Sequence, residues 1–415
     1  MGLSLGLMGL GLTSSQVGKP GVVLPSLYQG QVATKSRTPT ALSTTNKTAT
    51  SRSHHIARDN ITSLKIELPN WYWARSTVGP ETNGGGNITY TASIEYPAAT
   101  FTQVLFTGAT SKVVASGASV LSDSVSVSIP SGASFWVRTF ANAVTAIVFT
   151  DSNSGFAQRD LGNGEAYEYS ASTTTDKTMG GTVNDVGAAA APIFCPTAIV
   201  AQTRNPSVLI IGDSRDWGFT DTLDSSGDLG DLARGLGPSF GYINAGCAGD
   251  TLSAFNAGST KRAALQQYCS HVVIGDVINA LRASPGQAKT AAAVLIELQT
   301  ALGLFSTKRC LTTTTGGPGT ATSSDNFATT ANQSVNGNAA AVSAYNDAIR
   351  AGVANSLGYF EIADQVESAR NSGKWWVTGV ANATTTDGLH STQLGYLRIK
   401  NNGAVNTALI SRAGL

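Results

Sequence analysis

The spacing of hydrophobic and polar residues changes character along the 415 residues of the chain. From Ile61 to about Tyr169, hydrophobic residues recur at every second position in short runs, as in Ile61–Leu68. Similar runs occur at 88–96, 101–106, 124–129, 134–140 and 144–149. Alternation of this kind is typical of half-buried strands. Because Gly and Pro separate most of the runs, we expect an antiparallel β-sandwich or jelly roll over residues 60–178.

Residues 205–415 show a different pattern, in which short apolar runs alternate with helical stretches. The expected strands are 207–211, 240–244, 271–275, 307–312 and 358–363. The expected helices lie near 228–236, 254–269, 286–303, 338–354 and 392–411. This alternation predicts a doubly wound parallel sheet with helices on both faces. Its first strand, Val208–Ile211, is apolar throughout, which is typical of a strand buried on both faces.

The remaining segments have no sustained hydrophobic period. Residues 1–59 are rich in Gly, Ser and Thr, and Thr38–Ser51 cannot bury a core of its own. We expect 1–59 to form an extended anchoring arm held by other chains, or alternatively an arm folded over its own domain. The histidines in it, His54 and His55, are expected to be solvated. The Gly/Ala-rich residues 179–204 are expected to be a connector.

The composition excludes several classes of function. Charged residues make up 13% of the chain and the net charge is +1, so bulk charge does not attract nucleic acid. No apolar stretch is long enough to span a bilayer, so no membrane insertion is expected. The four cysteines form no CxxC pair and no cluster with histidine, so we expect buried thiols and no metal site.

Candidate chemistry begins where the first parallel strand ends, at Gly212-Asp213-Ser214. Polar residues at the carboxyl end of a buried strand occupy the edge where open α/β sheets bind ligands. Ser214 is therefore a candidate nucleophile, although a strand-ending turn with a Ser helix cap would have the same sequence.

A nucleophilic serine needs a base and an orienting carboxylate. His271 begins an apolar strand and is expected to be a satisfied strand-end residue. His390 lies in Asp387-Gly-Leu-His390, where Asp387 can reach the imidazole within one turn. The alternative is an ordinary Asp at a helix start with a surface His.

Two further segments offer donors to an oxyanion. A glycine in Asn244–Thr251, placed at Gly249, lets a backbone N–H approach a reacting centre closely. Asn279, near the end of the 271–275 strand, supplies a side-chain amide.

Together these segments resemble the blocks of the SGNH/GDSL hydrolase superfamily, in the same order. Gly212–Gly218 matches GDSxxxG, Asn244–Thr251 resembles the block with the oxyanion glycine, and Asp387–His390 matches DxxH. The GxND block of the superfamily is not matched fully. If its Asn is aligned, it corresponds to Asn279; if its Gly is aligned, it corresponds to Gly275, and Asp276 then follows without an evident role. We prefer Asn279 because Gly275 has no evident role.

The resemblance covers about half of the chain and implies a flavodoxin-like three-layer fold and a serine esterase. It implies that Ser214 attacks the ester, His390 is the base and Asp387 orients it. The N–H groups of Ser214 and Gly249 and the amide of Asn279 would form the oxyanion hole. No cofactor or metal is implied.

The tryptophans bear on the choice of ester. Trp217, Trp375 and Trp376 lie close in sequence to the Ser214 or His390 blocks and are candidates for a sugar-stacking surface, with packing as the alternative. Among residues 60–178, Trp71, Trp73 and Trp136 present the same two alternatives.

The arm followed by a β domain looks like appendage proteins of tailed phages. That second resemblance implies a homo-oligomeric esterase in a virion or extracellular, acting on acylated cell-surface polysaccharide, with residues 1–59 contacting other virion chains or copies of itself. One alternative is a secreted bacterial carbohydrate or lipase-like esterase with a β carbohydrate-binding module. The other is a catalytically inactive structural or adhesion protein of the virion.

Overall fold

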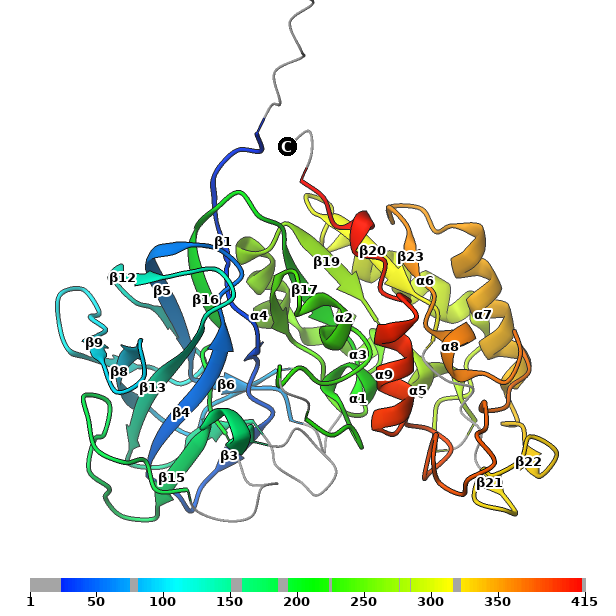
Figure 1. The fold of residues 1–415 in the computed structure, drawn as a ribbon, viewed down its shortest axis with the longest axis horizontal. Helices are drawn as coiled ribbons and strands as arrows, with labels where there is room; N and C mark the ends of the chain where they lie inside the picture. Colours follow the sequence, from blue (N-terminus) through cyan, green and yellow to red (C-terminus); the bar gives the residue numbers. More distant parts are fainter. Residues whose placement is uncertain are drawn as a thin grey trace, which may run out of the picture.

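The computed structural model describes residues 24–74, 81–150, 159–185, 193–223, 226–275, 277–283, 285–315 and 322–412. An antiparallel β half, made mainly from the first half of the chain, lies beside an α/β half made from the second (Figure 1).

The elements have the following bounds. The strands are β1 Tyr28–Gln31, β2 Ser36–Arg37, β3 Ala41–Ser43, β4 Thr48–Ile56, β5 Ile61–Pro69, β6 Trp71–Tyr72, β7 Thr82–Asn83, β8 Ile88–Glu95, β9 Phe101–Gln103, β10 Ser111–Val114, β11 Ser119–Leu121, β12 Val125–Ile129, β13 Ser134–Ala143, β14 Ile147–Phe149, β15 Ala166–Ser170, β16 Ala198–Thr203, β17 Ser207–Ile211, β18 Gly241–Asn244, β19 His271–Ile274, β20 Arg309–Thr313, β21 Thr322–Ser323, β22 Gln333–Ser334 and β23 Tyr359–Phe360. The α-helices are α1 Ser214–Trp217, α2 Ala233–Leu236, α3 Leu252–Gly258, α4 Thr260–Ala264, α5 Ile278–Leu281, α6 Ala291–Gly303, α7 Ala339–Ala351, α8 Ala363–Val366 and α9 Gln393–Asn401. Three 3₁₀ helices are η1 Leu161–Asn163, η2 Leu265–Tyr268 and η3 Thr407–Leu409.

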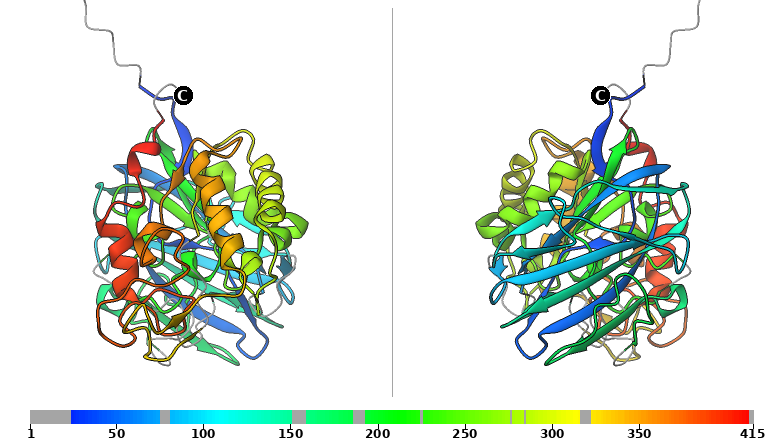
Figure 2. Two further views of the ribbon diagram at one scale, coloured as in Figure 1. Left: turned by 90° about the vertical axis from the view of Figure 1, so that its right-hand side faces the viewer. Right: turned by 90° about the vertical axis from the view of Figure 1, so that its left-hand side faces the viewer.

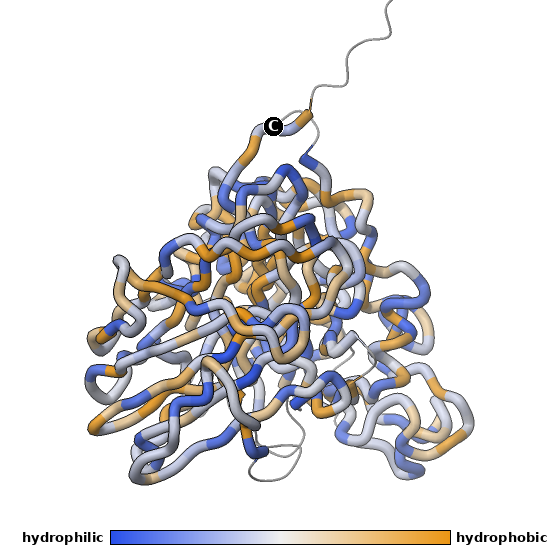
Figure 3. Tube along the Cα trace, turned by 60° about the vertical axis from the view of Figure 1, so that its left-hand side comes forward, coloured by the Kyte–Doolittle hydropathy of each residue, from blue (hydrophilic) through white to orange (hydrophobic). Residues whose placement is uncertain are grey.

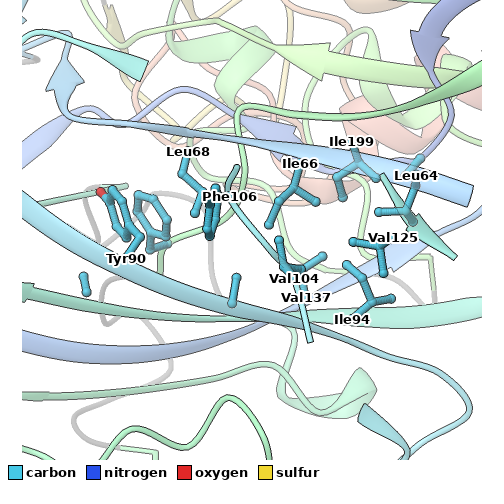
Figure 4. Close-up of a cluster of buried hydrophobic side chains, with 14 of the residues drawn as sticks. Leu64, Ile66, Leu68, Tyr90, Ile94, Val104, Phe106, Val125, Val137 and Ile199 are labelled. Atoms are coloured by element: carbon cyan, nitrogen blue, oxygen red, sulfur yellow. The ribbon is translucent and has the colours of Figure 1, made fainter. Parts of the chain in front are cut away.

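The antiparallel half consists mainly of two sheets that share one hydrophobic core. One sheet has the order β1-β16-β5-β11 with β12 also on β5, and the other has the order β10-β8-β13-β4-β15 with β9 on β8. Side chains such as Ile66 from β5 meet side chains such as Ile94 from β8 and Val137 from β13 (Figure 4). Each of the six predicted runs contains an observed strand. The sandwich or jelly-roll topology itself stays a prediction.

The expectation for residues 1–59 is wrong over its described part, 24–59. These residues carry β1 to β4, and β4 pairs with β13 over Thr48–Ile56 in the middle of a sheet. His54 and His55 are consequently buried and not solvated. The connector 179–204 also contains a core strand, β16, which pairs with both β1 and β5.

The α/β half is built on a parallel sheet with the order β2-β18-β17-β19-β20-β23. Its last five strands have the 2-1-3-4-5 order of a flavodoxin-like doubly wound sheet, as the strand–helix alternation and the resemblance predict. The one unexpected strand is β2, which comes from the N-terminal segment and lies parallel to β18 at the edge.

The buried strand β17 explains the three layers. Leu209 and Ile211 pack into a cluster with residues of α3, α6 and α7. Val208 and Ile210 point to the other face, into a cluster with residues of α2, α8 and α9. Figure 2 shows α7 (orange) and α9 (red) on different sides of the sheet. The hydropathy trace in Figure 3 shows hydrophobic segments gathered in the middle of the molecule.

The observed helices are shorter than the predicted stretches, and the stretch near 228–236 contains only α2, Ala233–Leu236. The stretch 254–269 divides into α3, α4 and η2, with the break at Gly258-Ser259. The last helix stops at Asn401, because Gly403 follows in the left-handed conformation with φ of 68°. No helix in the described part of the chain is long and apolar enough to cross a membrane.

Candidate active site

The nucleophile candidate lies at the carboxyl end of β17. Ser214 is the first residue of α1 and is 6% exposed. The preceding Asp213 caps this helix, because its Oδ1 accepts the Arg215 N–H at 3.0 Å. Gly212 is needed beside it, since a Cβ there would overlap the carboxylate of Asp216. The turn therefore holds the Ser214 side chain at the edge of the sheet.

Three predicted residues from distant parts of the chain come together here. Ser214 Oγ lies 2.7 Å from His390 Nε2. His390 Nδ1 lies 2.6 Å from Asp387 Oδ2, across one turn of chain. When Nδ1 carries the proton, Nε2 has a free lone pair that can accept the proton of the Ser214 hydroxyl. The geometry is that of a nucleophile, a base and an orienting acid.

The surroundings of Asp387 keep it ionised. Burial raises its pKa, but the contact with His390 and two backbone donors outweigh burial and lower the pKa to about 2. The donors are the N–H groups of Leu389 and His390, each 2.8 Å from Oδ1. One carboxylate oxygen thus shapes the turn while the other orients the imidazole.

The other three histidines lie away from Ser214 and make contacts of their own. Burial lowers the pKa of His55 to about 3, and its Nδ1 lies 2.8 Å from the Thr34 carbonyl. Burial lowers the pKa of His271 to about 4 at the start of β19, as expected for a strand-end residue. His54 lies 2.9 Å from Ser134 Oγ in the antiparallel half.

Gly249 lies at the tip of the loop after β18, in the left-handed conformation with φ of 85°. The Asp250 N–H donates to the Cys247 carbonyl at 3.1 Å, which closes the turn that requires this glycine. Within the described part of the chain, the N–H groups of Ser214 and Gly249 donate to no partner. Both are available as donors to an oxyanion.

Asn279 lies between the two loops but is used differently from the prediction. Its Nδ2 donates to Asp213 Oδ2 at 3.2 Å and to the Asp250 carbonyl at 3.1 Å. The two hydrogens of the amide are thereby engaged, so in this conformation none is left for an oxyanion. Asn279 braces the residue before Ser214 against the residue after Gly249.

The structure also gives Gly275 a role that the sequence did not suggest. It follows β19, and a Cβ there would overlap the carboxylate of Asp216, as at Gly212. Two glycines on neighbouring strands thus make room for one buried carboxylate behind Ser214. Asp276, the other residue left open by the GxND departure, lies outside the described residues.

Two of the three tryptophans proposed as a stacking surface are buried, whereas Trp376 is partly exposed. Trp375 is 0% exposed, and its Nε1–H donates to the Gly388 carbonyl at 2.9 Å, inside the Asp387–His390 turn. Trp217, 2% exposed, packs against Ala248. The ring of Trp376 lies under the guanidinium of Arg398 at 4.1 Å. Buried rings cannot stack on a sugar, so packing is correct for Trp375 and Trp217.

In the antiparallel half, packing is likewise the role of the two buried tryptophans. Trp71 and Trp73 are each 1% exposed. The half-buried Trp136 lies under Arg52 at 4.1 Å and donates its Nε1–H to the Asn163 carbonyl at 2.8 Å.

Two residues at the site were not found from the sequence. Arg215 Nε donates to the Leu389 carbonyl at 3.0 Å, which ties α1 to the residue before His390. The ring of Phe219 lies edge-on to the His390 ring, with centroids 4.3 Å apart. Their positions next to the nucleophile block were visible, but their partners lie far away in the chain.

The described part of the chain contains no group of three His, Cys, Asp or Glu residues that could hold a metal ion. Its four cysteines are buried and form no disulfide, in agreement with the prediction of buried thiols. Burial raises the pKa of Cys195 and Cys310 to about 11, so these thiols are protonated and inert near neutral pH.

Comparison with known proteins gave matches only among solved structures. No protein-family model and no curated protein matches the chain. A GDSL-like lipase from Bacteroides thetaiotaomicron is 16% identical, with 49% of this chain and 87% of that chain covered and a TM-score of 0.32. An acetylxylan esterase from Geobacillus stearothermophilus, solved as a catalytic mutant, is 14% identical, with 50% and 94% covered and a TM-score of 0.33.

A family two carbohydrate esterase from Cellvibrio japonicus matches over both halves. It is 9% identical, with 94% of this chain and 96% of that chain covered and a TM-score of 0.33. At such low identities and TM-scores, these likenesses assign neither a family nor an activity to the chain. The chemistry has to come from the side chains at the site.

Proposed function

We propose that the chain is a serine esterase that hydrolyses short O-acyl esters, O-acetyl esters above all. The observation that carries this proposal is the hydrogen-bonded relay from Ser214 through His390 to Asp387. A serine hydroxyl is a weak nucleophile until an oriented base removes its proton, and this relay supplies the base.

In the first step, Ser214 Oγ attacks the ester carbonyl while His390 Nε2 takes the hydroxyl proton. The Asp387 carboxylate stabilises the imidazolium, and the N–H groups of Ser214 and Gly249 donate to the developing oxyanion. His390 then protonates the leaving alcohol, and an acyl-enzyme remains on Ser214. In the second step His390 activates a water molecule, which releases the carboxylic acid and restores the serine.

The preference for a short acyl group rests on the side chains beside the relay. Phe219 lies against His390, and it also packs with Trp217 and Ala248, the residue before Gly249. We infer that the Phe219 ring beside the base limits the length of the acyl chain.

The polymer and its setting extend the proposal. We propose cell-surface polysaccharide as the acylated substrate and a virion or extracellular location, with the chain in a homo-oligomer. The N-terminal residues no longer support this setting over 24–59, because they belong to the sheets. A secreted carbohydrate esterase has the same chemistry, and detection of the protein in purified virions would separate the two. The alternative of a catalytically inactive structural protein is tested by measuring whether the chain hydrolyses an ester.

The test compares wild type with Ser214→Ala and His390→Ala on p-nitrophenyl acetate and on longer-chain esters. Each substitution should lower kcat by about 10⁴- to 10⁶-fold, since triad members act as a unit. Ser131→Ala, at an exposed serine of the antiparallel half, is the control and should match wild type. A fluorophosphonate probe should label wild type but not Ser214→Ala. Activity that survives Ser214→Ala would contradict the proposal.

A further inference from the structure

A buried arginine joins the two halves of the molecule beside the loop that carries Gly249. Arg262 lies on α4, and its side chain is 0% exposed. The centre of its guanidinium lies 3.7 Å from the ring centroid of Trp73, which directly follows β6 in the antiparallel half. β6 lies on the side of that half that faces α3 (Figure 1). The ring centroid of Phe255, on α3, lies 4.9 Å from the same guanidinium.

The hydrogen bonds of this guanidinium reach the two ends of the Gly249 loop. Arg262 Nη1 donates to Asp250 Oδ2 at 2.7 Å and to the Ala245 carbonyl at 3.1 Å. Nη2 donates to Ser259 Oγ at 2.6 Å. Ala245 begins the loop and Asp250 directly follows Gly249, so one planar group fixes both ends of the loop from behind.

The antiparallel half also holds the backbone of α4. Glu81 accepts the N–H groups of Lys261 at 2.7 Å and of Arg262 at 2.6 Å. Lys261 Nζ donates to Asn83 Oδ1 at 2.7 Å, on strand β7. The contact therefore includes a stacked ring, a carboxylate and an amide from one half, all converging on two residues of the other.

A buried arginine is costly unless its donors and its charge are compensated. Here the charge is compensated from both halves, by Asp250 at 2.7 Å from Nη1 and by Glu81 at 3.9 Å from Nε, although Nε itself has no hydrogen-bond partner within the described residues. Asp250 is held on its backbone side as well, because its carbonyl accepts from Asn279. A donor N–H is effective only if it is already in place when the charge develops on the oxyanion.

We propose that Arg262 is a positioning residue, through which the antiparallel half holds the Gly249 N–H at the oxyanion. The inference rests on the proposed esterase function and adds to it that the two halves form one catalytic unit. The antiparallel half is then part of the active-site support, whatever else it binds.

The experiment measures kcat and KM on p-nitrophenyl acetate for wild type, Arg262→Lys and Trp73→Leu. Arg262→Lys keeps the charge but loses the planar fork, and Trp73→Leu removes the aromatic face from the other half. Each should lower kcat by about 10- to 100-fold, less than the loss of an oxyanion donor itself. KM should stay within about twofold, because the donor acts in the transition state.

The control breaks a contact between the two halves at the amino end of β17, the end of the strand opposite to Ser214. Tyr28 OH lies 2.7 Å from Ser207 Oγ, at the start of β17. Tyr28→Phe removes this hydrogen bond without touching the Gly249 loop, so it should lower the melting temperature while kcat stays at the wild-type value. Circular dichroism checks that every variant is folded.

The outcomes separate this inference from the proposed function. If wild type hydrolyses the ester and both Arg262→Lys and Trp73→Leu retain wild-type kcat, the positioning role is refuted and the esterase stands. If the Lys variant does not fold, Trp73→Leu decides alone. If wild type neither hydrolyses an ester nor reacts with a fluorophosphonate, the esterase proposal fails, and the positioning role fails with it.

Discussion

Replacement of Trp375 by Phe tests how much the Asp387–His390 turn depends on a side chain beneath it. Trp375 is 0% exposed, and its indole N–H donates to the Gly388 carbonyl at 2.9 Å. Gly388 is itself buried and has φ of 71°, so its peptide groups have a fixed orientation. Phe keeps an aromatic ring in the cluster but removes the only donor that the indole has.

The expected loss of stability has two parts. Leaving the buried Gly388 carbonyl without its donor costs about 1–3 kcal/mol. The smaller ring leaves space among Ile362, Val366 and the other members of the cluster, which costs about 1–2 kcal/mol more. Together these predict a decrease of about 2–5 kcal/mol in the free energy of unfolding. Because the freed turn carries both Asp387 and His390, kcat should fall about tenfold or more.

Urea unfolding followed by circular dichroism measures the first effect, and hydrolysis of p-nitrophenyl acetate measures the second. Trp376→Phe is the matched control: its indole nitrogen is buried and has no hydrogen-bond partner within the described residues. It should change stability by less than about 1 kcal/mol and leave kcat unchanged. If Trp375→Phe unfolds and reacts like wild type, the indole does not support the turn. A raised KM in Trp376→Phe would instead indicate contact with substrate.

Two further predictions concern neighbouring side chains. Glu367 is 4% exposed, and burial raises its pKa to about 7 from an ordinary 4.5. Between these two pKa values the folded state keeps a proton that the unfolded state loses. The free energy of unfolding of wild type should therefore fall as pH rises from about 4.5 to 7, by on the order of 3 kcal/mol. Glu367→Gln should remove that fall. The prediction is refuted if the free energies of unfolding of wild type and Glu367→Gln, measured in urea, change with pH in the same way. Phe219→Ala should weaken the preference for acetate over hexanoate esters in kcat/KM and lower kcat on acetate about fivefold; an unchanged preference would show that the ring does not limit acyl length.

Most of the α/β half could be predicted from the sequence because its signals are local. The run Val208–Ile211 specifies a doubly buried strand by itself, and Asp387 reaches His390 within a single turn. The order of the blocks along the chain then places Ser214 and His390 at the same edge of one sheet.

The antiparallel half shows where such reasoning stops. Strand β4 reads Thr-Ala-Thr-Ser-Arg-Ser-His-His-Ile, which has no hydrophobic period, although nearly all of it is buried. Several of its polar groups are satisfied by residues from other segments: Ser51 Oγ donates to the Phe194 carbonyl, and His55 Nδ1 lies 2.8 Å from the Thr34 carbonyl. Buried polar side chains are stabilised by their hydrogen-bond partners, and a single sequence does not show which residues those partners are.

The same limit applies at the site. Trp375 is buried beneath Gly388, and both amide hydrogens of Asn279 are donated to Asp213 and Asp250. These arrangements result from tertiary contacts that the sequence does not show. Residue type showed which side chains carry a hydrogen-bond donor, but it did not show the direction in which each one points.

Strand β2 has a consequence for how this gene could be cut and recombined. It follows β1, a strand of the antiparallel half, and precedes the other strands of that half, yet it pairs with β18, which comes after all of them. Tyr242 N–H also donates to the Ala33 carbonyl at 3.1 Å, so residues 33–38 run along the edge of β18. A fragment starting at residue 205 would expose this edge as a template for aggregation. Exchange of the α/β half with that of another protein would therefore need three crossovers, one on each side of β2 and one after β16.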